Sequence, residues 1–275
     1  MNVNPRALLE RYDVLPKKSL GQNFLHDPNA LEKIVDTAEL MPEDTVLEIG
    51  PGTGALTEVL ARSAARVVAV ELDQRLAPIL QERLADYPNV TIVFQDILET
   101  DVPALMETEG YVVVANVPYY ITSAILKVLL ENEHRPRRLV LTMQQEVAER
   151  LIAKPNDMSI LAVSVQFFGQ PKIAMRINPS VFWPRPEVDS AVVIIDTYAT
   201  PPVDVSDAKR FFRVVKAGFG QKRKQLKNAL GSGLALNSEQ TAALCESAGI
   251  DPRRRAETLT LEEWAALTRA TTLLP

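Results

Sequence analysis

The segment Asn116-Val117-Pro118-Tyr119 follows an apolar, valine-rich run and carries groups that could act on a nucleobase. The Asn116 carboxamide oxygen and a main-chain carbonyl beside it can accept the two N–H groups of an exocyclic amine such as that of adenine. This would concentrate electron density on a nitrogen whose lone pair is otherwise delocalised, and would aim it at a methyl donor. Pro118 stiffens the turn, and the Tyr119 ring can hold an extruded base by stacking, worth roughly 1–3 kcal/mol.

An ordinary turn between a strand and a helix would also explain Asn and Pro at these positions. For the tetrapeptide alone, the catalytic and the structural interpretation are evenly balanced. The tetrapeptide follows the fourth of several predicted strands, and the first of those strands leads into a glycine-rich loop. This context favours catalysis.

The glycine-rich loop is Gly50-Pro51-Gly52-Thr53-Gly54. Glycines let the main chain turn sharply and approach a ligand without an obstructing Cβ. Glu71 closes the next predicted strand, where its carboxylate can accept hydrogen bonds from both hydroxyls of a ribose, and Asp96 ends the third. Ligands of open α/β sheets bind at this carboxyl edge, so three glycines and two carboxylates favour a ligand site over a tight turn without a ligand.

The loop also fits the loose dinucleotide pattern G-x-G-x-x-G/A, which makes a nicotinamide oxidoreductase the first rival. Glu48, two residues before the loop, counts against this rival, because a pyrophosphate at a helix N-terminus needs positive potential. A sulfonium ligand with an ammonium group would instead be attracted to a carboxylate.

The positions of the tetrapeptide and the glycine-rich loop are set by helices and strands that the hydrophobic periodicity predicts. Apolar runs alternate with segments of helical periodicity, which indicates a parallel sheet covered on both faces. The predicted strands are 45–50, 66–71, 90–95, 111–117 and 138–143, and the helices are 29–40, 55–65, 74–86, 121–131 and 146–153. After Pro155, the runs 160–168, 172–177 and 191–197 predict further strands joined by hairpin-like connections.

The prolines at 201 and 202 mark a change in the sequence pattern from alternating strands and helices to helices alone. Beyond them the periodicity is helical, with helices predicted at 207–217, 222–230, 239–247 and 261–270. We therefore predict an α/β domain over residues 1–200 and a small all-helical domain over residues 201–275.

The composition is that of a globular protein, with 47% hydrophobic and 24% charged residues. No apolar run reaches the roughly 18 residues of a membrane span, and the N-terminus lacks the apolar core of a signal peptide. One cysteine and two histidines are a poor set of zinc ligands. We expect a cytoplasmic protein without a metal ion. The net charge is −5, yet residues 201–275 carry 12 basic and 8 acidic side chains.

Seven motifs in register resemble those of the S-adenosylmethionine-dependent ribosomal RNA adenine dimethyltransferases. They lie at residues 19–25, 48–54, 71–73, 95–97, 116–120, 180–192 and 220–230. The resemblance runs from about Pro16 to Leu267. It implies a Rossmann-like class I methyltransferase sheet of seven strands, the last antiparallel, followed by a helical C-terminal domain.

The same resemblance implies S-adenosylmethionine as the cofactor, bound by Asn23, Leu25, Gly50, Glu71, Asp96 and Asn116. It assigns catalysis to Asn116, Pro118, Tyr119 and Phe182, with Phe182 stacking on the other face of the target base. The implied substrate is 16S rRNA within a small ribosomal subunit or its precursor. Two adjacent adenosines in its 3′-terminal hairpin would become N6,N6-dimethyladenosine.

The predicted helix 222–230 is basic and resembles the basic helix of the family's C-terminal domain. RNA affinity depends on the phosphates neutralised locally rather than on total charge. We therefore expect RNA binding by Lys222, Arg223, Lys224 and Lys227. We also expect a monomer that makes no membrane contact.

Three alternatives stay open. A 23S rRNA adenine N6-methyltransferase shares the first five motifs, but residues 188–192 and the basic segment favour the small-subunit enzyme. A nicotinamide oxidoreductase leaves Asn116 and Tyr119 unexplained. A non-catalytic RNA-binding assembly factor could use the same fold, but these two residues argue for retained chemistry.

Overall fold

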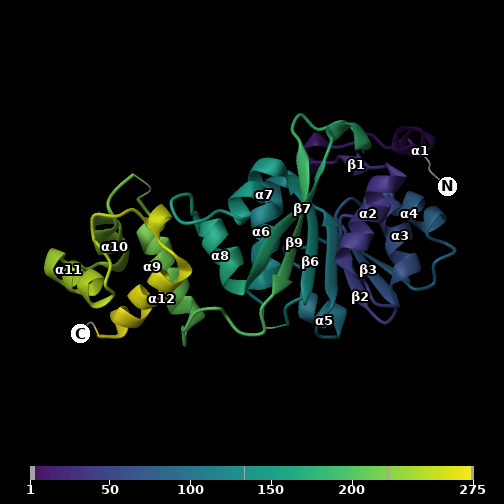
Figure 1. Ribbon diagram of the computed structural model, residues 1–275. Helices are drawn as coiled ribbons and strands as arrows, with labels where there is room; N and C mark the ends of the chain where they lie inside the picture. Colours follow the sequence, from purple (N-terminus) through teal and green to yellow (C-terminus); the bar gives the residue numbers. More distant parts are fainter. Residues whose placement is uncertain (1–3, 133, 222, 274–275) are drawn as a thin grey trace. The chain divides into compact units, whose positions relative to one another are not determined.

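The computed structural model describes residues 4–132, 134–221 and 223–273, and the chain divides into two compact units (Figure 1). The first unit comprises Met1–Ala148 and Gln170–Thr197, and the second comprises Glu149–Gly169 and Tyr198–Pro275. The last crossing between the units, after Thr197, lies close to the predicted boundary at residue 200. Residues 149–169, which we placed in the α/β domain, group with the C-terminal helices instead.

The first unit is built on a seven-stranded sheet in the order β4-β3-β2-β5-β6-β9-β7. The strands β2 to β6 pair in parallel, and β9 pairs with β6 in the antiparallel sense. This confirms the predicted Rossmann-like α/β sheet. The strands are β2 (Thr45–Ile49), β3 (Arg66–Glu71), β4 (Val90–Phe94), β5 (Val112–Asn116), β6 (Arg138–Gln144), β7 (Gly169–Ile177) and β9 (Ser190–Thr197).

The helices of this unit follow the predicted alternation. They are α1 (Pro5–Arg11), α2 (Pro28–Ala38), α3 (Ala55–Ser63), α4 (Ala77–Arg83), α5 (Val102–Met106) and α6 (Thr122–Leu130), with 3₁₀ turns at Lys18–Leu20, Gln74–Leu76, Tyr119–Ile121 and Pro179–Val181. Asp27 caps α2 by accepting the N–H of Ala30 at 2.8 Å, and Pro28 occupies the first helical position.

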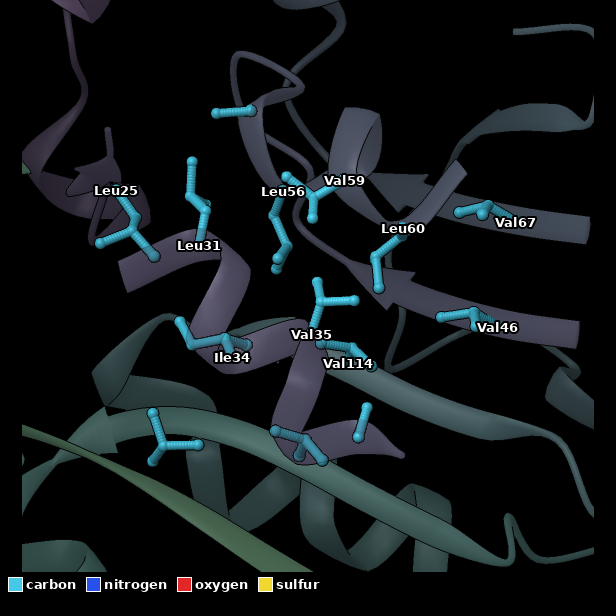
Figure 2. Packing of buried hydrophobic residues seen from close by; sticks show 14 of the residues in the cluster. Leu25, Leu31, Ile34, Val35, Val46, Leu56, Val59, Leu60, Val67 and Val114 are labelled. Carbon is cyan, nitrogen blue, oxygen red and sulfur yellow. The ribbon is translucent and has the colours of Figure 1, made fainter. Parts of the chain in front are cut away.

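The helices α2 and α3 pack their apolar faces onto one face of the sheet. Figure 2 shows Ile34 and Leu60 from these helices in one cluster with Val46 and Val114 of β2 and β5. All four side chains are fully buried, and each such burial stabilises the fold by about 1.5–3 kcal/mol. This packing holds the two strands whose carboxyl ends carry the glycine-rich loop and Asn116.

A second, two-stranded sheet was not predicted from the sequence. The strands β1 (Phe24–Leu25) and β8 (Phe182–Trp183) are antiparallel, with Phe24 opposite Trp183 and Leu25 opposite Phe182. This ladder ties the N-terminal segment to a loop that lies far away in the sequence.

The prediction of a strand over residues 160–168 is wrong, because α8 (Ile160–Phe168) is a helix. Ser159 caps it by accepting the N–H of Ala162 at 3.2 Å. The helix is apolar on most sides because it packs within the second unit. A run of this kind has no hydrophobic periodicity, so its sequence pattern does not distinguish a buried helix from a buried strand.

The second unit is helical. Between the first unit and α8 lies α7 (Gln145–Leu151), which crosses the unit boundary, and the remaining helices are α9 (Ala208–Phe219), α10 (Leu226–Leu234), α11 (Ser238–Ser247) and α12 (Leu261–Ala270), with 3₁₀ turns at Ala256–Thr258 and Thr271–Leu273. Capping boxes begin α11 and α12, at Asn237 and Thr260. The Phe167 ring of α8 stacks on Phe211 of α9 with centroids 4.5 Å apart.

The predicted basic helix 222–230 is wrong at its start, because α10 begins at Leu226. Main-chain hydrogen bonds from Leu226 to Arg254 (2.7 Å) and from Lys227 to Pro252 (3.1 Å) anchor its first turn. Arg223 and Lys224 lie in the preceding turn.

Among the described residues, no helix is both long enough and apolar enough to cross a bilayer.

Replacing Gly218 with Ala should destabilise the second unit. A Cβ at Gly218 in α9 would overlap the ring of Trp264, which is completely buried in α12. We expect a loss of about 1–3 kcal/mol despite a better helix propensity. Thermal unfolding of the single variants and of Gly218→Ala combined with Trp264→Leu tests this. If the second change did not offset part of the loss, the clash would not be its cause.

Candidate active site

A pocket lies in the first unit at the carboxyl edge of the sheet, where β2 adjoins both β3 and β5. Open α/β sheets bind ligands at such a point, where the strand order reverses. All six residues predicted to bind the cofactor line this one pocket: Asn23, Leu25, Gly50, Glu71, Asp96 and Asn116. Sequence patterns that lie far apart therefore meet at one place.

The glycine-rich loop has the backbone conformation that its composition predicts. Gly50, Gly52 and Gly54 have φ angles of 69°, 58° and 80°, which side chains other than glycine rarely adopt. A Cβ on Gly52 would also lie 2.8 Å from the Phe24 ring. The loop thus packs closely under the N-terminal segment and exposes main chain to the pocket.

Glu71 and Asp96 are held at the ends of neighbouring strands. One Glu71 oxygen accepts the N–H of Gly52 at 3.1 Å and the other accepts that of Asp73 at 2.8 Å. Asp96 accepts the N–H of Leu98 at 2.8 Å through one oxygen. These bonds fix both carboxylates and leave lone pairs for ligand hydroxyl or amine groups.

Glu48 is the most unusual group in the pocket. It is 1% exposed, and its Oε2 atom accepts no hydrogen bond from the described residues. Burial, reinforced by the charge of nearby Glu71, raises the pKa of Glu48 to about 8. Burial also raises the pKa of Glu71.

The polarity of the pocket indicates the charge of its ligand. Three carboxylic acids, Glu48, Glu71 and Asp96, line it, and the described lining contains no Lys, Arg or His. A pyrophosphate would meet only negative or neutral groups, whereas a cation would be attracted. This charge pattern disfavours the nicotinamide alternative.

The Asn116 side chain has one defined orientation. Its Nδ2 donates to the main-chain carbonyl of Asn23 at 2.9 Å, so the carboxamide oxygen is the end left for a ligand. Asn116 is the last residue of β5 and is half-buried. The strand therefore presents a hydrogen-bond acceptor at the edge of the pocket, as the proposed chemistry requires.

Tyr119 and Pro118, which come soon after Asn116 in the sequence, line the same side of the pocket. The Tyr119 hydroxyl is 2.6 Å from Ser190 Oγ, and burial raises the pKa of this phenol. The hydrogen bond fixes the tilt of a half-buried ring that lines the pocket. Pro118 also lines the pocket and precedes the 3₁₀ turn Tyr119–Ile121.

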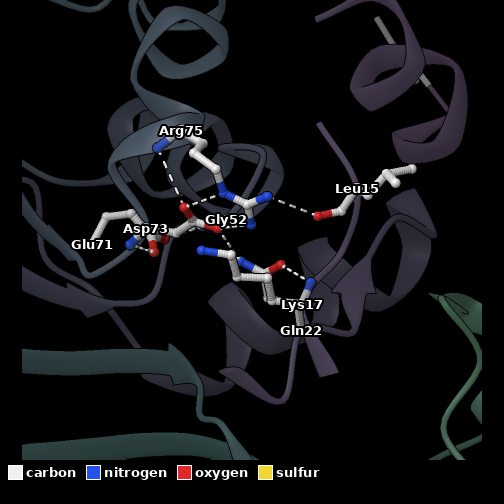
Figure 3. A network of polar contacts seen from close by, with 7 residues as sticks. All are labelled: Leu15, Lys17, Gln22, Gly52, Glu71, Asp73 and Arg75. Atoms are coloured by element: carbon white, nitrogen blue, oxygen red, sulfur yellow. Dashed lines mark hydrogen bonds and ion pairs between the residues drawn. The ribbon is translucent and has the colours of Figure 1, made fainter. Parts of the chain in front are cut away.

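A polar network joins the N-terminal segment to the end of β3, next to the pocket (Figure 3). Gln22 donates to Asp73 at 2.8 Å and accepts the N–H of Lys17 at 2.7 Å. The Arg75 guanidinium holds the same carboxylate at 2.6 Å and lowers the pKa of Asp73 to about 2. Our motifs contained Gln22 and Asp73, but no role for them was predicted, because only the folded chain brings them together.

Phe182 does not join the other predicted catalytic residues. Its ring is 3% exposed, packs in the cluster with Leu31 and Ile34, and does not line the pocket. Its stacking on a target base stays a prediction that this placement does not support. Its exposure to a base would require the ring to leave the core.

The residues predicted to bind RNA belong to the second unit. Arg223, Lys224 and Lys227 are exposed. Lys222 lies outside the described residues.

The model of the family described as ribosomal RNA adenine dimethylase matches residues 15–272. The chain belongs to the ribosomal RNA adenine dimethylase family. It is 47% identical over 276 residues to the ribosomal RNA small subunit methyltransferase A of Geobacillus sp. (strain WCH70), covering 96% of this chain and 94% of that protein. The protein of the same name from Dehalococcoides mccartyi (strain CBDB1) is 44% identical, with 95% and 90% covered.

Two solved structures are similar in fold. The 23S rRNA methyltransferase ErmE superposes with a TM-score of 0.72 at 29% identity, covering 90% of this chain and 99% of that one. A dimethyladenosine transferase from Plasmodium falciparum gives a TM-score of 0.74 at 24% identity, covering 89% and 95%. The second likeness shows the fold alone.

Glu48 should make the stability of the ligand-free dimethylase depend on pH. A carboxyl with an ordinary pKa of 4.5 when unfolded and about 8 when folded binds more protons in the folded state between these values. Stability therefore falls as the pH rises from about 5 to 8, by up to about 1.4 kcal/mol per pH unit. Thermal unfolding between pH 5 and 9 measures this.

Glu48→Gln mimics the protonated carboxyl and should flatten the pH profile. Glu43→Gln, which changes an exposed carboxyl, should leave the profile parallel to that of the wild type. A wild-type profile that rises from pH 5 to 8, or one that Glu48→Gln does not alter, would contradict the assignment.

Proposed function

We propose that this protein transfers methyl groups from S-adenosylmethionine to N6 of two adjacent adenosines in the 3′-terminal hairpin of 16S rRNA. The reaction would take place within a small ribosomal subunit or its precursor and would form part of subunit assembly. We further propose that the protein acts in the cytoplasm and as a monomer.

The observation that carries the proposal is the fixed Asn116 amide. Its nitrogen is committed to the Asn23 carbonyl, so the oxygen is available to accept an N–H of the target amine. The same pocket contains the glycine-rich loop and the three acids. An acceptor for the amine thus adjoins the place suited to a cationic methyl donor.

The pocket residues fit S-adenosylmethionine. Glu71, at the end of β3, would accept the ribose hydroxyls, and Asp96 would accept the adenine amine of the cofactor. Glu48 lies next to the glycine-rich loop, where a bound cation would favour its ionised form, and Gly50 leaves room for the ligand to approach the main chain. When bound, this cofactor supplies a methyl group on a positively charged sulfur.

The residues of the chain act on the target amine by position and electrostatics. Asn116 and a neighbouring carbonyl hold both N–H groups, which turns the nitrogen lone pair towards the methyl carbon. For each methyl group that a bound cofactor would supply, the target nitrogen would give up one proton to solvent. Tyr119, fixed by Ser190, would stack on the flipped base.

The relatives favour the small-subunit substrate over the 23S alternative. Proteins named small subunit methyltransferase A are 43–47% identical to this chain, whereas the 23S rRNA methyltransferase ErmE is 29% identical. Asn116 and Tyr119 lie in the pocket wall, which favours an enzyme over a non-catalytic assembly factor.

The direct test is methylation of small subunits that lack the two dimethyladenosines. Incubation with the protein and S-adenosylmethionine should add four methyl groups, two to each adenosine, as measured by mass spectrometry of the 16S rRNA. Methylation elsewhere would contradict the proposed target. Calorimetric titration with S-adenosylmethionine and with NAD separates the donor classes, and binding of NAD alone would overturn the proposal.

Asn116→Ala should reduce turnover far more than cofactor binding. We expect kcat to fall by roughly 100-fold or more, because one preorganised hydrogen-bond partner of the reacting group is lost. The Kd for S-adenosylmethionine should change only a few-fold. Single-turnover methylation of undermethylated subunits and calorimetry measure the two effects.

Tyr119→Phe is the matched comparison, because it keeps the ring and removes only the hydroxyl that meets Ser190. Its turnover should fall much less than that of Asn116→Ala. Wild-type turnover in Asn116→Ala would show that the amide does not act on the target amine.

The exposed cations of the second unit should contribute to RNA affinity. Changing Arg223, Lys224 and Lys227 to Gln should weaken binding to subunit RNA and lower the slope of log K against log salt by about 2 to 3. Binding measured at several salt concentrations tests this.

Arg253→Gln is the control for the cation cluster, since Arg253 is exposed but pairs with Asp251 at 3.2 Å. This variant should lower the salt slope by less than one third of the change produced by the triple variant. An unchanged slope in the triple variant would remove this cluster from the RNA interface.

A further inference from the structure

A second hollow in the first unit adjoins the cofactor pocket, and we call it the side groove. Gly21, Gln22, Asn23 and Tyr119 line both hollows. The side groove therefore begins at the Tyr119 ring and at Asn23, whose main-chain carbonyl accepts the hydrogen bond from the Asn116 amide. Its other walls come from Arg6, Leu9, Glu10, the segment 14–16, Lys18, Gln144 and the segment 183–188.

Trp183 gives the side groove a fixed aromatic surface. Its main chain pairs with Phe24 in the β1–β8 ladder, and its ring packs against the cluster that contains Leu9 and Val14. The residue is nevertheless only half-buried and lines the groove. A ring held by packing on one side and open on another is suited to stacking with a planar group.

Cations line the same groove as this ring. Lys18 and Arg185 are exposed, and neither forms an ion pair with a described residue. Arg6 is paired with Glu10 at 2.8 Å, and Glu187 is the other acid in the lining. The two unpaired cations thus outnumber the one unpaired acid, which suits an anionic group.

The rim of the two hollows is unusually apolar. Eight large hydrophobic residues are exposed among the described residues, and four of them line these hollows: Leu15 and Val188 in the side groove, Leu72 and Tyr120 in the cofactor pocket. Exposed apolar groups gathered around a concave site indicate a surface that a partner covers.

We propose that the side groove binds the nucleotide next to the target adenine, with its base stacked on Trp183 and its phosphate beside Lys18 and Arg185. The proposal rests on the function proposed above and deepens it. A nucleotide combines a flat ring with an anion, and the groove offers an aromatic ring with unpaired cations and leads directly to Tyr119. Of two adjacent adenosines, one would occupy the groove while the other is methylated.

The test uses two variants that keep the fold. Trp183→Leu preserves apolar packing but removes the aromatic surface, and Arg185→Gln changes an exposed side chain. Each should raise the KM for undermethylated small subunits, Trp183→Leu by roughly 5- to 100-fold, while the Kd for S-adenosylmethionine stays within about twofold. Trp183→Phe should recover part of the loss. Lys172→Gln, an exposed cation outside both hollows, is the charge control and should leave KM unchanged.

A second measurement reports stacking directly. The hairpin RNA carries 2-aminopurine in place of the adenosine beside the target, and its fluorescence should fall on binding to the wild type but not to Trp183→Leu. Unchanged KM and unchanged quenching in this variant would overturn the groove assignment, while wild-type methylation would leave the proposed function intact. If KM rose but quenching persisted, a ribosomal protein would be the occupant, and the nucleotide assignment would be wrong. Failure of the wild type to methylate subunits would overturn both proposals.

Discussion

The active site depends on one hydrogen bond, from the Asn116 amide nitrogen to the main-chain carbonyl of Asn23 at 2.9 Å. A carboxamide turned the other way would place two oxygens against each other, so this bond decides which end of Asn116 meets a ligand. The bond joins the edge of a buried parallel sheet to a segment that lacks extended regular structure. The orientation of the Asn116 side chain at the sheet edge therefore depends on how firmly that segment is held.

Two contacts hold the segment in place. The β1–β8 ladder pairs Phe24 with Trp183, and Gln22 joins the Asp73–Arg75 ion pair at the end of β3. Both are formed by groups that lie far apart in the sequence. Together they bring the N-terminal segment, the acidic strand ends and the 183–188 loop to the same rim.

The sequence allowed prediction of the sheet and of the pocket for a simple reason. Parallel strands align their carboxyl ends, so Gly50, Glu71, Asp96 and Asn116 had to gather wherever those ends met. It could not distinguish the buried helix Ile160–Phe168 from a strand, since an apolar run lacks periodicity.

Other features depend on partners distant in the sequence. The start of α10 is determined by hydrogen bonds to Pro252 and Arg254, which no local pattern reveals. The burial of Phe182 follows from its pairing with Leu25, and the Trp183 ring faces a groove for the same reason. Motif reasoning therefore identified residues at strand ends better than residues positioned by the small ladder.

The acidic lining of the cofactor pocket also has a consequence for the catalytic cycle. If the donor is a sulfonium, methyl transfer turns a positively charged sulfur into a neutral thioether, and the attraction of the Glu71 and Asp96 carboxylates for that sulfur disappears with its charge. The spent nucleoside is then held less tightly than the fresh one. The same carboxyl groups that attract the methyl donor would thereby ease release of the spent product. This would help the exchange of product for fresh donor between successive methylations.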